Sequence, residues 1–146
     1  MKLGKALKYK NRLIRKINKI KGDISSNNSR DKEEQVEVNV KDLMEEYKRL
    51  VKEFVDLKLK IFEASRPIRE HIFKMSELKS EISWLSGIST KRGVVKYSSY
   101  HSEADKAEFE AAFSRMEIDE MIKNNEEEID KMQEEIDTFN YTTEIN

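Results

Sequence analysis

Residues 40–64 read VKDLMEEYKRLVKEFVDLKLKIFEA and carry the clearest structural signal in the chain. Apolar side chains recur there at alternating intervals of four and three residues: Leu43, Tyr47, Leu50, Phe54, Leu57, Ile61 and Ala64. This heptad spacing places them on one face of an α-helix, a seam typical of a helix packed against another helix. Asn39 is a favourable N-cap. We therefore predict a helix over 40–64.

Upstream of this helix, residues 3–24 carry a second apolar stripe with helical spacing: Ala6, Leu13, Ile17, Ile20 and Ile24, with Leu3, Leu7 and Ile14 alongside. We predict a helix over 3–24, closed by Gly22 and the serines and asparagines that follow. A polar loop over 25–38 then leads into the next helix.

Downstream, Pro67 disfavours helical geometry at the residue before it and fits the first turn of a new helix. We predict a break there and a helix over 67–86, with Gly87 as its left-handed terminator. Another complete seam follows: Ile118, Ile122, Asn125, Ile129, Met132, Ile136 and Phe139. A capping box of Ser114 and Glu117 predicts that this last helix covers 115–139. A buried Asn125 in the seam would fix its register.

Residues 87–113 interrupt the helical pattern and form the predicted head. Val94-Val95-Lys96-Tyr97 has strand propensity and follows a glycine. Residues 108–113 alternate apolar and polar side chains, which fits a second strand, but their Ala and Glu content fits a helix equally well.

The predicted fold is all-α in the main: one domain over 1–146, built as an elongated antiparallel helical bundle or coiled coil with a small β-hairpin head. Two complete seams on one chain of 146 residues also predict that some apolar surface is shared between subunits. We therefore expect a homo-oligomer.

Composition narrows the class of protein. Charged residues make up 39% of the chain, but the periodic apolar stripes argue against disorder. The chain has no cysteine, which suits a reducing compartment. No apolar run reaches the roughly 20 residues of a membrane span, and the basic start lacks the apolar core of a secretory signal. We expect a soluble cytoplasmic protein that does not enter membranes.

The two ends of the chain have opposite charge. Residues 1–22 contain nine Lys or Arg and no acid, whereas 115–146 contain eleven acids against Arg115, Lys123 and Lys131. One interpretation is a nucleic-acid or membrane surface at the basic end. We favour the other, in which the two ends pair within or between chains, and do not expect nucleic-acid binding.

Groups that could carry catalysis are few. The two histidines, His71 and His101, have no second ligand at metal-binding spacing, and no phosphate loop or nucleophile elbow is present. The many glutamates of the last helix flank its seam, as a solvated face would. We predict no enzyme activity, no metal and no cofactor.

The head is the part of the chain that best suits a ligand. Its cations could hold phosphates and its aromatic rings could stack on a base or sugar. The candidate ligand-binding residues are Trp84, Lys91, Arg92, Lys96, Tyr97, Tyr100 and Arg115. The alternative is an exposed hairpin whose aromatic side chains only cap the end of the bundle.

The order of these features resembles a family of small bacterial and phage proteins described as septicolysin-like or uncharacterised. The resemblance lies in Met1-Lys2-Leu3 with Ala6-Leu7, the long heptad helix, a tyrosine-containing hairpin and the ending Asn140-Tyr141-Thr142-Thr143-Glu144. It implies a hairpin over 94–113. It implies little about activity, because no membrane-inserting segment supports the cytolysin label.

In outline the chain also looks similar to phage anti-defence sponge proteins of the Thoeris-inhibiting kind. These are small helical oligomers that sequester cyclic ADP-ribose-type or cyclic oligonucleotide signals. The resemblance implies a non-enzymatic binding protein that holds such a signal without turnover. The alternative function is a structural or protein-interaction coiled-coil oligomer with no small ligand.

Overall fold

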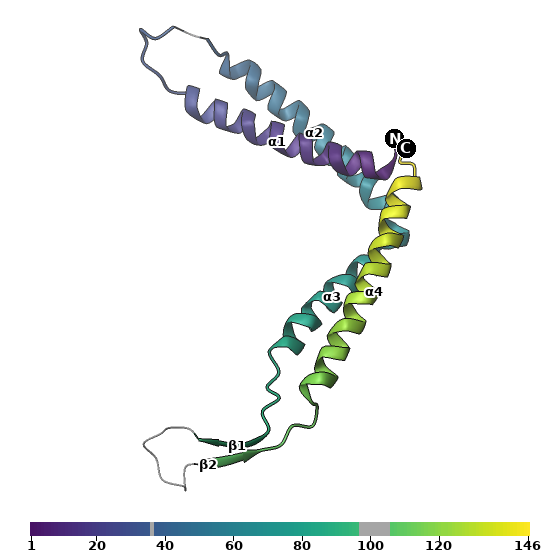
Figure 1. Ribbon diagram of the computed structural model, residues 1–146. Helices are drawn as coiled ribbons and strands as arrows, with labels where there is room; N and C mark the ends of the chain where they lie inside the picture. The colour runs from purple at the N-terminus through teal and green to yellow at the C-terminus, as the bar shows by residue number, and fades with distance from the viewer. Residues whose placement is uncertain (36, 97–105) are drawn as a thin grey trace. The chain divides into compact units, whose positions relative to one another are not determined.

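A computed structural model describes residues 1–35, 37–96 and 106–146. The chain is mainly helical with one two-stranded antiparallel sheet (Figure 1), which confirms the predicted class. The elements are α1 (Leu3–Asn27), α2 (Val40–Ala64), a 3₁₀ helix (Arg66–Ile68), α3 (Arg69–Ser86), β1 (Gly93–Lys96), β2 (Lys106–Phe109) and α4 (Arg115–Thr142). Two compact units can be recognised. Unit 1 is Met1–Arg69 with Ile136–Asn146, and unit 2 is Glu70–Glu135.

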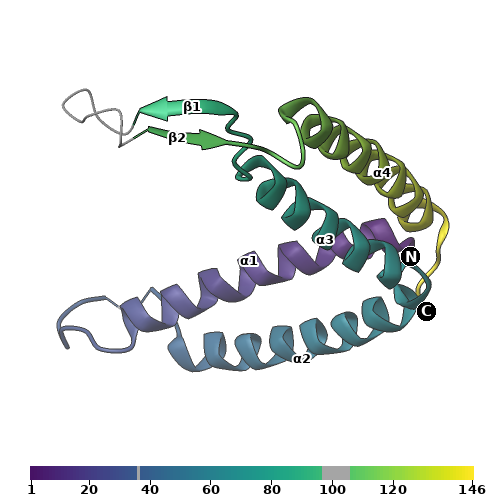
Figure 2. The same ribbon diagram turned by 90° about the horizontal axis from the view of Figure 1, so that it is seen from below.

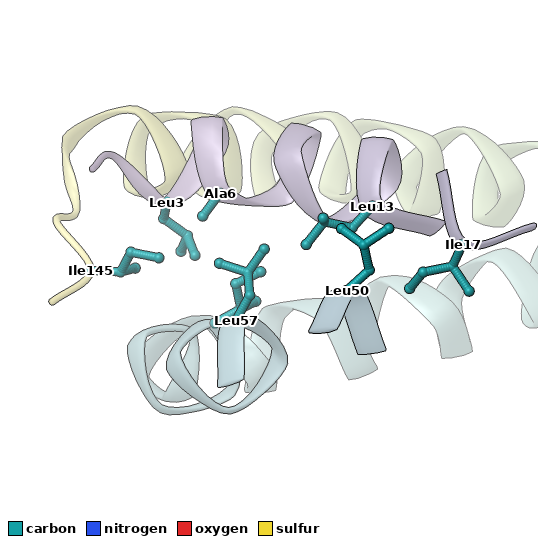
Figure 3. Packing of buried hydrophobic residues seen from close by; sticks show 8 residues of the cluster. Leu3, Ala6, Leu13, Ile17, Leu50, Leu57 and Ile145 are labelled. Carbon is teal, nitrogen blue, oxygen red and sulfur yellow. The ribbon is translucent and has the colours of Figure 1, made fainter. Parts of the chain in front are cut away.

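The core of unit 1 lies between α1 and α2, which run side by side in both views (Figures 1 and 2). Its buried side chains are Leu3, Ala6, Leu13, Ile17, Leu50, Leu57, Ile61 and Ile145. Figure 3 shows the labelled residues of α1 and α2 turned toward one another, with Ile145 beside them from the C-terminal tail. Apart from Ile145, all of them belong to the two apolar stripes that the sequence predicts. Asn39 caps α2 as predicted, because its Oδ1 accepts hydrogen bonds from the Lys41 and Asp42 amides.

A terminal clasp, made of Met1–Leu3 and Thr142–Ile145, closes this core. The Leu3 amide donates to the Thr143 carbonyl at 2.8 Å, and the Ile145 amide donates to the Met1 carbonyl at 2.9 Å. The Lys2 ammonium and the amino group of Met1 each lie 2.9 Å from a Glu144 carboxylate oxygen. Through these contacts the residues after α4 fold back on the start of α1.

In unit 2, polar contacts set an antiparallel register between α3 and α4. His71 Nε2 lies 2.5 Å from Glu135 Oε2, and Asn125 Nδ2 donates to Glu81 Oε2 at 3.1 Å. The two contacts agree, because ten residues separate the partners on each helix. Asn125 was expected to be buried within the seam, but it is only partly buried. Its amide bonds to a carboxylate of α3 at the edge of the helix pair.

Two predicted helix ends, and the predicted conformation of Gly87, differ from the structure. α1 continues through Gly22 to Asn27, where Asn27 Nδ2 donates to the Asp23 carbonyl and holds the last turn. α4 extends to Thr142, whose hydroxyl donates to the Thr138 carbonyl at 2.9 Å. Gly87 is not left-handed, since Gly93 is the only glycine with positive φ in the described chain. The Gly87 amide instead donates to the Trp84 carbonyl in a tight turn.

The break at Pro67 is confirmed. α2 ends at Ala64, the 3₁₀ helix holds the proline in its first turn, and α3 begins at Arg69. The capping box at the start of α4 is also present. The Ser114 amide donates to Glu117 Oε2 at 3.0 Å, and the Glu117 amide donates to Ser114 Oγ at 3.1 Å.

The hairpin pairs Gly93 with Phe109, Val94 with Glu108, Val95 with Ala107 and Lys96 with Lys106. Residues 106–109 are therefore strand, whereas 110–113 are neither strand nor helix. Gly93 has φ of +81°, a left-handed conformation that side chains with a Cβ rarely adopt.

We predict that Glu144→Gln weakens unit 1 and reduces its acid sensitivity. Hydrogen bonds from the N-terminal amine and from Lys2 lower the pKa of Glu144 from its ordinary 4.5 to about 2. A carboxylate with a depressed pKa stabilises the fold above its ordinary pKa, and this contribution is lost as the pH falls through 4.5 toward 2. Thermal unfolding across that pH window should show a smaller loss of stability in the variant.

Glu45→Gln is the matched control, because Glu45 is exposed on α2 and forms no ion pair among the described residues. It should follow the wild-type pH profile. A Glu144→Gln profile that is parallel to the wild type between the two pKa values would contradict the role given to the clasp.

Candidate site in the hairpin head

The hairpin register gathers a cationic and aromatic group at its base. Lys91 and Arg92 directly precede β1, and Phe109 ends β2. Because Gly93 pairs with Phe109, the two cations are brought beside the ring. The Lys91 ammonium lies 5.7 Å from the centroid of the Phe109 ring, within the range of a cation–π contact.

A shallow hollow of about 340 Å³ lies at this base, lined by Arg92, Phe109, Glu110 and Ala111. Arg92 is exposed, and within the described chain neither it nor Lys91 forms an ion pair. Two positive charges beside an aromatic face can attract an anion that also carries a flat ring. Glu110 is the acid of the hollow, and its carboxylate can accept hydrogen bonds from hydroxyl groups.

Two other predicted ligand residues, Trp84 and Arg115, are not gathered here. Trp84 belongs to α3, is 64% exposed and does not line this hollow. Arg115 starts α4, and its guanidinium donates twice to Asp119 Oδ1, at 2.9 and 3.0 Å. Lys96 ends β1 opposite Lys106. Tyr97 and Tyr100, together with His101, lie outside the described residues.

Sequence reasoning did not include Phe109 and Glu110 among the site residues. Their place depends on hairpin register, which cannot be read while 108–113 fits strand and helix equally. No local signal identifies them, because the left-handed conformation of Gly93 does not determine which residue of β2 lies opposite it.

A second polar cluster lies on α1 and α2 of unit 1. The Tyr9 hydroxyl donates to Glu53 Oε1, and Arg49 bridges Glu46 and Glu53. The hydrogen bond to Glu53, with burial, raises the pKa of Tyr9, and the hydrogen bond from Arg49 lowers the pKa of Glu46. An open hollow of about 420 Å³ lies beside this cluster. The Tyr9–Glu53 hydrogen bond joins α1 to α2, and the Arg49 guanidinium is already paired with two carboxylates of α2.

Neither a metal centre nor a membrane span is seen in the described parts of the chain. No group of three or more metal-ligating side chains gathers in residues 1–35, 37–96 and 106–146. No helix in those ranges combines the length and apolarity that crossing a bilayer requires. Comparison of the chain with protein-family models, curated proteins and solved structures gives no match.

We predict that Gly93→Ala loosens the base of the hairpin, because a Cβ at φ of +81° costs about 1–2 kcal/mol. The amides of Val95 and Ala107 should exchange with solvent about tenfold faster, the change that ~1.4 kcal/mol produces. Hydrogen exchange read by NMR checks this result.

Gly22→Ala is the matched control. Gly22 lies inside α1, and a Cβ there would meet nothing within 4 Å. Alanine should stabilise this helix by up to about 1 kcal/mol and leave hairpin exchange unchanged. Equal exchange rates at Val95 in Gly93→Ala and the wild type would show that the left-handed glycine is dispensable.

Proposed function

We propose that this is a non-enzymatic binding protein that holds a small phosphate-bearing ligand of the nucleotide type at the hairpin head. The observation that carries the proposal is the pair of cations, Lys91 and Arg92, without ion-pair partners in the described chain and beside the Phe109 ring. Phosphate oxygens form strong charge-assisted hydrogen bonds with such groups.

The composition of the hollow suits the other parts of a nucleotide. A base can stack on an aromatic ring, and a carboxylate such as that of Glu110 can accept hydrogen bonds from ribose hydroxyls. The volume of about 340 Å³ is at the small end of ligand pockets. A hollow of this size would hold only part of a cyclic ligand. We propose Lys96, Tyr97 and Tyr100 as the contacts for the remainder.

Sequestration without turnover is the proposed mode of action. The ligand class we propose is a cyclic ADP-ribose-like or cyclic oligonucleotide signal. This follows the resemblance to phage anti-defence sponge proteins, in which binding alone removes the signal.

A second candidate is the protein-interaction oligomer with no small ligand. It is favoured by an apolar face of α2, formed by Val55, Leu59 and Phe62 at helical spacing and rimmed by Lys58. Contiguous exposed apolar patches of this kind mark sites of protein association. Under this hypothesis the head cations make no contribution to binding.

We predict that Lys91→Ala combined with Arg92→Ala lowers affinity for the cognate nucleotide at least tenfold, because each hydrogen bond to a charged group contributes about 1.5–3 kcal/mol. Calorimetric titration with cyclic ADP-ribose and with a cyclic dinucleotide measures the effect. Native mass spectrometry of wild-type protein purified from cells tests for a retained nucleotide.

Lys79→Ala is the matched control, because Lys79 is an exposed, unpaired cation of α3 within the described chain. It should bind as the wild type does. No adduct, and no thermal stabilisation of the wild type by cyclic, linear or ADP-ribose-type nucleotides, would favour the protein-interaction oligomer, since ligands that bind the folded state raise its stability.

A further inference from the structure

The outer surface of α1 carries a basic stripe, defined as Lys5, Lys8, Arg12, Arg15 and Lys19. The five side chains are exposed and recur at intervals of three, four, three and four residues. They lie on the helix face that turns away from the buried residues of α1, such as Leu13 and Ile17. The stripe extends about 21 Å at 1.5 Å per residue. None of these cations forms an ion pair in the described chain.

The outer surface of α4 carries an acidic stripe, defined as Glu120, Glu127, Asp130 and Glu134. These side chains are exposed and lie opposite the apolar seam of the helix. With Lys123 included, the positions recur at the same intervals of three, four, three and four residues. None of the four acids forms an ion pair within the described residues.

Both stripes place like charges where they repel. Lys8 and Arg12 are four residues apart on α1, as are Asp130 and Glu134 on α4. Like charges at this spacing lie on neighbouring turns and destabilise a helix. A solvated helix face more commonly interleaves opposite charges, which support each other. The repulsion within each stripe is relieved when a stripe of opposite charge lies against it.

We propose that the basic stripe of one copy docks on the acidic stripe of a second copy of this chain. Aligned in parallel, Lys5 faces Glu120, Arg12 faces Glu127, Arg15 faces Asp130 and Lys19 faces Glu134. Only the Lys8 and Lys123 pair joins like charges. Charge complementarity of this kind selects partners and sets their register. This inference does not depend on the nucleotide proposal, because the stripes and the hairpin head share no residue.

The parallel alignment requires a second copy. In one chain the Leu3 amide is hydrogen-bonded to the Thr143 carbonyl, so the start of α1 is tied to the end of α4. Pairing within that chain would have to run antiparallel. The intervals then match only after a shift of one stripe position, and three pairs of opposite charge form rather than four. A nucleic acid is the other class of partner for a basic stripe, and the test below includes it as a distinct outcome.

The test is sedimentation velocity of the full chain at about 50 mM and about 500 mM salt, where surface charges are weakly and strongly screened, respectively. The variants are Arg12→Glu with Arg15→Glu, and Glu127→Lys with Asp130→Lys. Circular dichroism verifies that each variant folds. Lys41→Glu with Lys48→Glu is the matched control, because both lysines are exposed and unpaired on α2 among the described residues.

The expected result is self-association at low salt that weakens at high salt. Each reversed pair should weaken association at least tenfold, and mixing the two variants should restore it. The control should associate as the wild type does.

Several outcomes would overturn the proposal. One is a wild type that stays monomeric at low salt. Another is association that the two stripe variants leave unchanged, or that the control weakens equally. A third is unchanged mass with lowered stability in both stripe variants, which would indicate pairing within one chain. Binding of a labelled duplex that is lost in Arg12→Glu with Arg15→Glu, without self-association of the wild type, would assign the stripe to nucleic acid.

Discussion

Unit 1 depends on the apolar seam between α1 and α2. Each buried leucine or isoleucine there contributes about 1.5–3 kcal/mol by leaving water. Leu3 is the first residue of α1, so no earlier turn of that helix can shield its side chain from water. Another segment must bury this end of the seam. Ile145 supplies that cover from the other end of the chain and is buried in the same cluster. The backbone hydrogen bonds of the terminal clasp hold Ile145 beside Leu3. The close approach of α1 to the end of α4 also limits the residue at position 4. A Cβ on Gly4 would lie 3.3 Å from the Asn140 carbonyl oxygen.

Unit 2 is held in a different way. Among its described residues the buried side chains are few, namely Met75, Leu85 and Ile118. Two polar contacts set the register of its helices. Its hairpin has strands of four residues each, and a two-stranded hairpin is marginally stable in water. A ligand held at the base of such a hairpin would stabilise the folded head by mass action. A weakly stabilised head is therefore compatible with a binding role.

How well the sequence predicted each feature depended on whether nearby residues or pairing between segments determine that feature. Heptad spacing placed the α2 seam correctly, and Asn39 and Ser114 marked helix starts because their capping contacts are local. Glycine was a poorer guide. Gly22 lies inside a helix and Gly93 adopts the left-handed conformation, and only neighbouring backbone distinguishes these cases. The hollow beside Arg92 depends on strand register, which arises from pairing across the hairpin and is absent from the local sequence.

α2 provides an internal comparison for the two charged stripes. On α2, Arg49 lies between Glu46 and Glu53 and pairs with both, so opposite charges are interleaved and satisfied on one helix. In contrast, the basic stripe of α1 holds cations alone and the acidic stripe of α4 holds acids apart from Lys123, although the net charge of the chain is only −1. Interleaving would have removed the repulsion within each stripe without altering the buried seams, because stripe and seam lie on opposite faces. The segregation therefore does not serve the fold of either helix alone. Contact between each stripe and a stripe of opposite charge would account for the segregation. This supports assembly between copies through the outer faces of α1 and α4.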